Sequence, residues 1–291
     1  MNDLVPVIGL LHPGAMGAAI GAQAASVGCR VLWVPDGRSP ATRARADAAG
    51  LTAVSNLAEL CHTSDIIVSV CPPAHAVDVA GDVAETRYSG LYVDANAVSP
   101  RTMERISAKF DGLGVSLVDG GIVGQPPSTH ASARLYLSGA DEAAERVRAL
   151  FAGSAAVEPV VLSGAVGRAS ALKLAFAAYN KVSHVLAAYS LALAAGYGVA
   201  DPLSELAAEA LPNTPLGSPA RLTSAAAKAW RWEPEFREIA DAGTAVGLAP
   251  DLLLAAAAIL DRWSHHKDLT DTPLPQLIAE LANHGTVASL G

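Results

Sequence analysis

The chain opens with an apolar strand that runs into a glycine-rich loop and then into a helix of small residues. Residues 5–17 read Val-Pro-Val-Ile-Gly-Leu-Leu-His-Pro-Gly-Ala-Met-Gly, and a helix is expected over 18–27. Glycines in such a turn allow a tight bend, a close backbone approach to a pyrophosphate, and close packing of helix on strand. The helix start would direct unpaired N–H groups at the phosphates. The loop therefore predicts a dinucleotide site that comprises Gly9, His12, Pro13, Gly14, Ala15, Met16 and Gly17. The spacing is G-x4-G-x2-G instead of G-x-G-x-x-G, so an ordinary glycine-rich turn is the alternative.

A second apolar strand, residues 29–35, follows after one helix and completes the β-α-β unit that this fingerprint requires. In NAD-binding proteins an acidic residue at the end of this strand holds the ribose 2′-OH, and Asp36 stands there. Arg38, Ser39 and Arg43 follow it, and a guanidinium pairs well with a phosphate dianion. We therefore predict NADP as the cofactor, with NAD the less favoured choice. Solvated arginines at a helix start would give the same pattern.

Composition favours a small-molecule enzyme. The net charge is −8 and no basic run occurs, which argues against nucleic acid as a partner. The three cysteines form no C-x-x-C pair, which is typical of a reduced, cytoplasmic protein. The N-terminus lacks the basic start of a signal peptide, and charged residues interrupt the apolar stretch 165–199. We expect a cytoplasmic protein that does not associate with membranes.

Strand and helix patterns alternate to about residue 160, and only helical patterns follow. This order predicts an α/β fold, a Rossmann-type doubly wound sheet followed by an all-α C-terminal domain. The expected domains are 1–163, which binds the cofactor, and 164–291, which binds substrate and pairs with a second copy as a homodimer. Cys71, Pro72 and Pro73 follow a strand at its carboxyl end and are expected to line the cofactor site.

Five motifs then appear in an order that resembles the β-hydroxyacid dehydrogenase superfamily. They are Gly14-Ala-Met-Gly17, Val70-Cys-Pro-Pro73, Asp94-Ala-Asn-Ala-Val-Ser-Pro100, Asp119-Gly-Gly-Ile-Val-Gly124 and Gly164-Ala-Val-Gly-Arg-Ala-Ser-Ala-Leu-Lys173. This superfamily includes 3-hydroxyisobutyrate and 6-phosphogluconate dehydrogenases and the related imine reductases. Residues 229–240 and 247–250 are similar to a 6-phosphogluconate dehydrogenase-like branch. The resemblance extends over nearly the whole chain.

The resemblance implies that Lys173 is the catalytic residue, the general acid when a carbonyl is reduced. The alternative is a lysine that reaches from an apolar helix to solvent. Relatives carry an asparagine four residues after this lysine, whereas this chain has Ala177, so Asn180, Lys181 or Tyr179 could replace it. Where acid-specific relatives have a serine beside two glycines, this chain has Val123-Gly124-Gln125.

The resemblance also places Asn96 near the nicotinamide or the substrate. The predicted substrate-binding residues are thus Asn96, Val123, Gly124, Gln125 and Asn180.

The sequence predicts no metal site. His265 and His266 are adjacent and lack the i, i+4 spacing of a helical zinc site, which favours a surface turn. The predicted activity is an NADP-dependent transfer of hydride between nicotinamide and a small carbonyl or hydroxy compound. An imine reductase is one alternative, although imine reductases generally have another residue at the lysine position. A cofactor-binding regulatory protein that has lost catalysis is the other, because Ala177 and Val123 replace expected polar residues.

Overall fold

The structure is a computed structural model that describes residues 6–282. The chain forms two compact units, Met1–Leu174 and Ala175–Gly291. Helix α7 (Arg168–Gly196) contributes its first residues to unit 1 and the remainder to unit 2.

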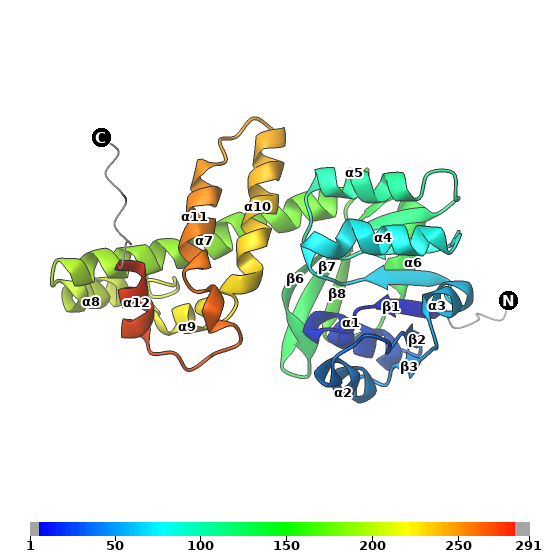
Figure 1. Cartoon of the computed structure of the whole chain (residues 1–291), viewed down its shortest axis with the longest axis horizontal. Helices are drawn as coiled ribbons and strands as arrows, with labels where there is room; N and C mark the ends of the chain where they lie inside the picture. The colour runs from blue at the N-terminus through cyan, green and yellow to red at the C-terminus, as the bar shows by residue number, and fades with distance from the viewer. Residues whose placement is uncertain (1–5, 283–291) are drawn as a thin grey trace. The chain divides into compact units, whose positions relative to one another are not determined.

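Unit 1 is built on an eight-stranded sheet with the strand order β3-β2-β1-β4-β5-β6-β7-β8 (Figure 1). The strands are β1 (Val7–Leu11), β2 (Arg30–Trp33), β3 (Thr52–Ala53), β4 (Ile66–Ser69), β5 (Leu91–Asp94), β6 (Ser116–Ser128), β7 (Ala131–Gly139) and β8 (Val157–Val161). All neighbours pair in parallel except β6 and β7. The order 3-2-1-4-5-6 is that of a dinucleotide-binding doubly wound sheet, so the predicted fold class is confirmed.

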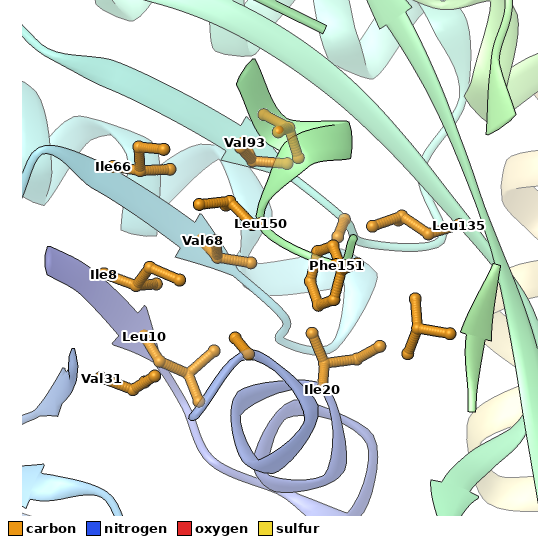
Figure 2. Packing of buried hydrophobic residues seen from close by; sticks show 14 of the residues in the cluster. Ile8, Leu10, Ile20, Val31, Ile66, Val68, Val93, Leu135, Leu150 and Phe151 are labelled. Carbon is orange, nitrogen blue, oxygen red and sulfur yellow. The ribbon is translucent and has the colours of Figure 1, made fainter. Parts of the chain in front are cut away.

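Helices cover both faces of this sheet. They are α1 (Ala15–Ser26), α2 (Pro40–Ala48), α3 (Leu57–Thr63), η1 (Pro73–His75), α4 (Ala76–Glu85), α5 (Pro100–Lys109) and α6 (Asp141–Ala149). One core cluster joins the sheet to α1, α2 and α6, and a second joins it to α3, α4 and α5. Figure 2 shows Ile8, Leu10, Ile66 and Val68 of neighbouring strands packed in the first cluster. Each such side chain contributes about 1.5–3 kcal/mol on full burial. This packing holds the carboxyl ends of the strands in place.

Strand β6 is much longer than predicted. The sequence indicates a strand only over 115–118, but β6 continues to Ser128 and pairs antiparallel with β7. The register shifts between Gly124 and Ser128, and Gly124 has φ 132°, where a Cβ would lie 2.7 Å from Ser132 O. The prediction was wrong because glycines and prolines usually end a strand, whereas here they form its irregular outer part.

Unit 2 consists of helices. They are the remainder of α7, α8 (Ala200–Ala210), α9 (Ala220–Ala226), α10 (Ala229–Ala245), α11 (Asp251–Asp261), η2 (Ser264–His266) and α12 (Leu274–Ala282). The sequence pattern predicts separate helices over 220–230 and 235–246, with Pro234 between them, whereas in the structure α10 runs through Pro234. Trp232 and Phe236 are buried on either side of this proline, so packing outweighs the lost backbone hydrogen bond. Over residues 6–282, no helix is long and apolar enough to cross a membrane.

Candidate functional site

The glycine loop joins β1 to α1 and leaves an open space at the helix start. A Cβ on Gly9 would clash with Leu60 Cδ2, and one on Gly17 would lie 2.6 Å from His12 O. A Cβ on Gly14 would meet no atom within 4 Å. Two of the three glycines therefore permit packing of helix and strand, and Gly14 leaves room above the first turn of α1. Gly14, the N-cap, offers no side-chain hydrogen bond to the first N–H groups of α1, which also lack intrahelical acceptors.

His12 and Arg38 place unsatisfied polar atoms beside this loop. His12 has φ 65°, and its buried Nδ1 has no hydrogen-bond partner. Burial, with the positive charges of Arg38 and His75, lowers the His12 pKa to about 4, so the ring is neutral at pH 7. The buried Nε of Arg38 also lacks an acceptor, and burial lowers its pKa as well. A guanidinium N–H without an acceptor is costly, and an anionic oxygen would satisfy it.

The other predicted cofactor residues lie at the start of α2, at the start of α1 and after β4. Ser39 caps α2 by accepting a hydrogen bond from Thr42 N at 3.2 Å, and Arg43 Nε donates to Arg38 O at 3.3 Å; both side chains are exposed. Ala15 and Met16 begin α1, Pro13 precedes it, and Pro72 and Pro73 lead from β4 into η1. Burial, assisted by the charge of Asp94, raises the pKa of the Cys71 thiol to about 12, so this thiol stays protonated. All three cysteines of the chain are free.

A row of buried polar residues crosses the carboxyl end of the sheet. Ser69, Asp94, Asp119 and Ser138 lie opposite one another on β4, β5, β6 and β7, and all are fully buried. We call them the polar row. Burial raises the pKa of Asp94 to about 7, because hydrogen bonds from Asn96 and the charge of Lys173 offset only part of the cost of removing a carboxylate from water.

Asn96 connects the first half of the polar row to the β4 loop. Its Nδ2 donates to Asp94 Oδ2 at 2.8 Å and to Ser69 Oγ at 3.1 Å. Its Oδ1 accepts from Cys71 N at 2.5 Å. The amide of Asn96 is thus engaged with protein atoms, and its backbone carbonyl accepts a hydrogen bond from Lys173 Nζ at 3.2 Å.

Asp119 holds the start of α7. Its Oδ2 accepts from Ser138 Oγ at 3.0 Å and from Gly167 N and Ser170 N at 2.9 Å, and its Oδ1 accepts from Ser170 Oγ at 2.6 Å. A buried carboxylate thereby satisfies N–H groups that a helix start leaves without acceptors. A Cβ on Gly121 would lie 2.7 Å from Ala169 O, so this glycine lets α7 approach β6. Lys173 follows one turn later on the same helix.

The structure gathers some of the predicted substrate residues and separates others. Asn96 and Lys173 are in hydrogen-bond contact. Val123, Gly124 and Gln125 lie within β6 instead of in a loop at a strand end, and Gly124 and Gln125 are exposed. Asn180 lies seven residues after Lys173 on α7 and its side chain is exposed, while Lys181 forms an ion pair with buried Glu235.

Sequence reasoning missed the roles of Ser69, Asp119, Ser138 and Ser170. A readable signal existed for three of them, because Ser69, Asp119 and Ser138 each follow an apolar strand run, Ile-Ile-Val, Leu-Val and Leu-Tyr-Leu. Ser170 carries no such signal, since its role depends on how α7 packs against β6.

An open glycine cradle, a helix start aimed at it, and polar groups at the carboxyl ends of parallel strands define a dinucleotide-binding α/β protein. A family model for the NAD binding domain of 6-phosphogluconate dehydrogenase matches residues 5–167. A second model, a domain of unknown function called DUF1932, matches residues 194–263. The chain belongs to the β-hydroxyacid dehydrogenase-like family, which places it among the NAD(P)-dependent oxidoreductases.

One curated relative is an uncharacterized 28.5 kDa protein from the 7S RNA 5′ region of Methanothermus fervidus. It is 30% identical over 173 residues, which cover 60% of this chain and 65% of that protein. The match therefore spans somewhat less than two thirds of that relative's length.

Several solved structures share the fold. The conserved protein MTH1747, whose structure is similar to 3-hydroxyacid dehydrogenases, is 25% identical with a TM-score of 0.66, over 89% of this chain and 98% of that one. The 3-hydroxyisobutyrate dehydrogenase of Mycobacterium tuberculosis, solved with L-serine, is 20% identical with a TM-score of 0.72. The match covers 96% of this chain and 99% of that one. An imine reductase from a Pseudomonas species is 18% identical with a TM-score of 0.54, and the match covers 96% of this chain and 100% of that one.

Proposed function

We propose that this protein is an NADP-dependent oxidoreductase that reduces a small carbonyl compound, or oxidises the corresponding alcohol, with Lys173 as the proton donor. The observation that carries the proposal is the position of Lys173. Its Nζ is hydrogen-bonded to Asn96 O beside the polar row, at the edge where the parallel strands β1, β4 and β5 end. The glycine loop lies at the end of β1 on that same edge.

The residues at the loop fit a phosphorylated dinucleotide. The space above Gly14 and the uncapped start of α1 suit a pyrophosphate. The buried Nε of Arg38 has no acceptor, and a 2′-phosphate oxygen would supply one. Ser39 and Arg43 follow Arg38 at the start of α2 and offer further donors. Asp36, the residue that would favour NAD, is exposed.

The chain's own residues account for the proton transfer. When bound, the nicotinamide supplies or accepts a hydride at the substrate carbon. Reduction leaves negative charge on the substrate oxygen, and Lys173 Nζ gives a proton to that oxygen; in the reverse direction the amine takes the proton from the hydroxyl. The carbonyl of Asn96 orients the ammonium group, and the Asn96 amide holds that carbonyl in place through Asp94, Ser69 and Cys71 N. Asn96 is therefore proposed as a positioning residue.

Substitution of Lys173 tests this role. Lys173→Met keeps the length of the side chain and removes the proton donor, so turnover of NADPH with aldehydes and with 2- and 3-oxo acids should fall by at least about 100-fold, the lower range for general acid catalysis. The affinity for NADPH, measured by fluorescence titration, should change less than about threefold, because Lys173 is not in the cradle. Lys109→Met, at an exposed lysine of α5, is the matched control. Equal turnover in Lys173→Met and the control would refute the assignment.

Imine reduction is the second candidate, because the fold is shared with a solved imine reductase. The same assay with a cyclic imine separates the two activities. An imine reductase would be favoured if the Lys173→Met variant still reduced the imine and no carbonyl compound was turned over. NADPH binding without turnover of any substrate in the panel would instead favour a regulatory protein.

We also propose that unit 2 pairs with a second copy of the chain. Large apolar side chains on α7 remain exposed, among them Phe176, Tyr179, Leu186, Tyr189 and Leu193. Tyr179, Leu186 and Leu193 recur every seven residues, the spacing of a helix seam that packs on another helix. A self-complementary dimer would cover this stripe. Light scattering should give a dimer mass for the native chain, and Leu186→Glu with Leu193→Glu should give a monomer; a native monomer at micromolar concentration would refute it.

A further inference from the structure

Two histidines and a glutamate converge near the end of unit 2, in a region that the proposed activity does not use. His266 Nε2 lies 2.8 Å from Glu280 Oε2, and His265 Nε2 lies 3.7 Å from the same oxygen. The ring centroids of the two histidines are 4.0 Å apart. One ligand atom from each of the three residues can be chosen so that all lie within 4.8 Å of one another. The histidines belong to η2 and the glutamate to α12, so the cluster joins two segments of the chain.

The sequence predicts a surface turn at these histidines, and for His266 that prediction was wrong. His266 is 3% exposed, whereas the His265 side chain is 60% exposed. The absent i, i+4 spacing is irrelevant here, because the third group arrives from α12, fourteen residues after His266. Folding therefore creates a convergence that spacing along a single helix cannot reveal.

Outer contacts orient buried His266 and half-buried Glu280. His266 Nδ1 lies 3.3 Å from the hydroxyl of buried Thr272, which can accept its N–H and leave the Nε2 lone pair directed at the cluster. Both Glu280 oxygens face His266 Nε2, Oε1 at 3.1 Å and Oε2 at 2.8 Å, and Gln276 Nε2 donates to Oε1 at 3.2 Å. Metal-binding histidines usually donate their second ring nitrogen to such a partner, and metal-binding carboxylates are usually hydrogen-bonded as well. A simple hydrogen bond between His266 and Glu280 would need neither contact, nor the second imidazole.

We propose that His265, His266 and Glu280 bind a divalent transition-metal ion, for which Zn²⁺ is the best match. Two imidazoles and one carboxylate are the ligands that zinc uses in three-ligand sites, with water in the fourth position. Ligands about 2.1 Å from a tetrahedral ion lie about 3.4 Å apart. The distances of 2.8 and 3.7 Å to Glu280 Oε2 bracket that spacing, so small rotations of the side chains suffice. The exposed side of His265 gives the ion and its water access to solvent. The ion would tie η2 to α12.

Metal titration of the whole chain tests this site. Protein dialysed against a chelator is titrated with Co²⁺, whose visible absorption reports tetrahedral ligation, and Zn²⁺ is then added in competition. We expect one equivalent of Co²⁺ to bind, Zn²⁺ to displace it, and Zn²⁺ to raise the melting temperature. His265→Ala should weaken binding at least about tenfold, and it does not endanger the fold because this ring is exposed. Glu280→Gln, which is isosteric, should behave similarly, and Thr272→Val should weaken binding about tenfold through His266.

The control is His130→Ala, at an exposed histidine of unit 1 outside the cluster. It should bind Co²⁺ as the native chain does. Native affinity in both His265→Ala and Glu280→Gln, an equal loss in His130→Ala, or no binding by the native chain at millimolar Co²⁺ and Zn²⁺ would each overturn the proposal. Because the readout is metal binding and melting temperature, the result is independent of any oxidoreductase activity.

Discussion

The hydrogen bonds of Asp119 give the most direct test of how the site is held together. This carboxylate is fully buried and accepts from two backbone N–H groups and the Ser170 hydroxyl at the start of α7, and from the Ser138 hydroxyl on β7. Asp119→Ala removes every acceptor. Asp119→Asn keeps an amide oxygen where Oδ2 stands, so both N–H groups retain an acceptor, and its amide nitrogen can donate to Ser170 Oγ.

The expected cost follows from what each variant leaves unpaired. In Asp119→Ala the N–H groups of Gly167 and Ser170 lose their acceptor, and a buried unsatisfied group costs about 1–3 kcal/mol. The first turn of α7 should therefore open more easily by about 2–6 kcal/mol. In Asp119→Asn only the charge is lost, and the difference between charged and neutral hydrogen bonds is about 1 kcal/mol each, or about 2 kcal/mol for the two N–H groups.

Hydrogen exchange measured by mass spectrometry reports the opening of the first turn of α7. The peptide over residues 163–174 should exchange more than about 30-fold faster in Asp119→Ala, because about 30-fold corresponds to about 2 kcal/mol, the lower end of the expected cost. It should exchange no more than about 30-fold faster in Asp119→Asn. A peptide over residues 7–26 is the internal control. Because Lys173 follows Ser170 on α7, kcat should fall in the same order while NADPH affinity is kept. Unchanged exchange over 163–174 in Asp119→Ala, or equal effects of Ala and Asn, would refute the reasoning.

Three further outcomes are expected. Arg38→Ala should raise the Kd for NADPH at least about tenfold and that for NADH less than about twofold, measured by calorimetry, because only the 2′-phosphate would satisfy the buried Nε; equal losses would contradict this role. Gly14→Val should weaken both cofactors with an unchanged melting temperature, since no protein atom lies within 4 Å of the added Cβ, whereas Gly17→Ala should lower the melting temperature because its Cβ would meet His12 O at 2.6 Å. Burial raises the pKa of Asp94 from 3.8 to about 7, so the stability that its protonated form provides is fully present below about pH 4 and is lost as pH rises through about 7. Asp94→Asn should flatten that part of the profile of melting temperature against pH, and an identical slope would argue against the raised pKa.

The alternation of apolar runs with helical patterns sufficed to predict the sheet and the helical C-terminal part. Buried parallel strands read as continuous apolar runs, and Ile66-Ile-Val and Leu91-Tyr-Val are such runs. The same logic failed at β6, whose outer half contains glycine and proline and is kept as a strand by pairing with β7. It failed again at Pro234, where burial of neighbouring aromatic residues keeps α10 continuous. In both places the deciding energy comes from pairing or packing with another element, which the local residue pattern does not show.

The candidate site, like the fold, was predictable from the sequence only in part. Position along the chain was enough to place Asp94 and Asn96 at a strand end and Lys173 on a long helix. The sequence did not show in which direction each polar side chain points. A buried carboxylate must find donors, and for Asp119 the available donors are the N–H groups that α7 leaves open at its start. Asn96 is held in the same way, since Ser69 and Asp94 accept its amide protons. The requirement to pair the polar row therefore fixes both the carbonyl that receives Lys173 and the helix that carries it. We infer that losing either Asp119 or Asn96 would displace the lysine without removing any group that reacts.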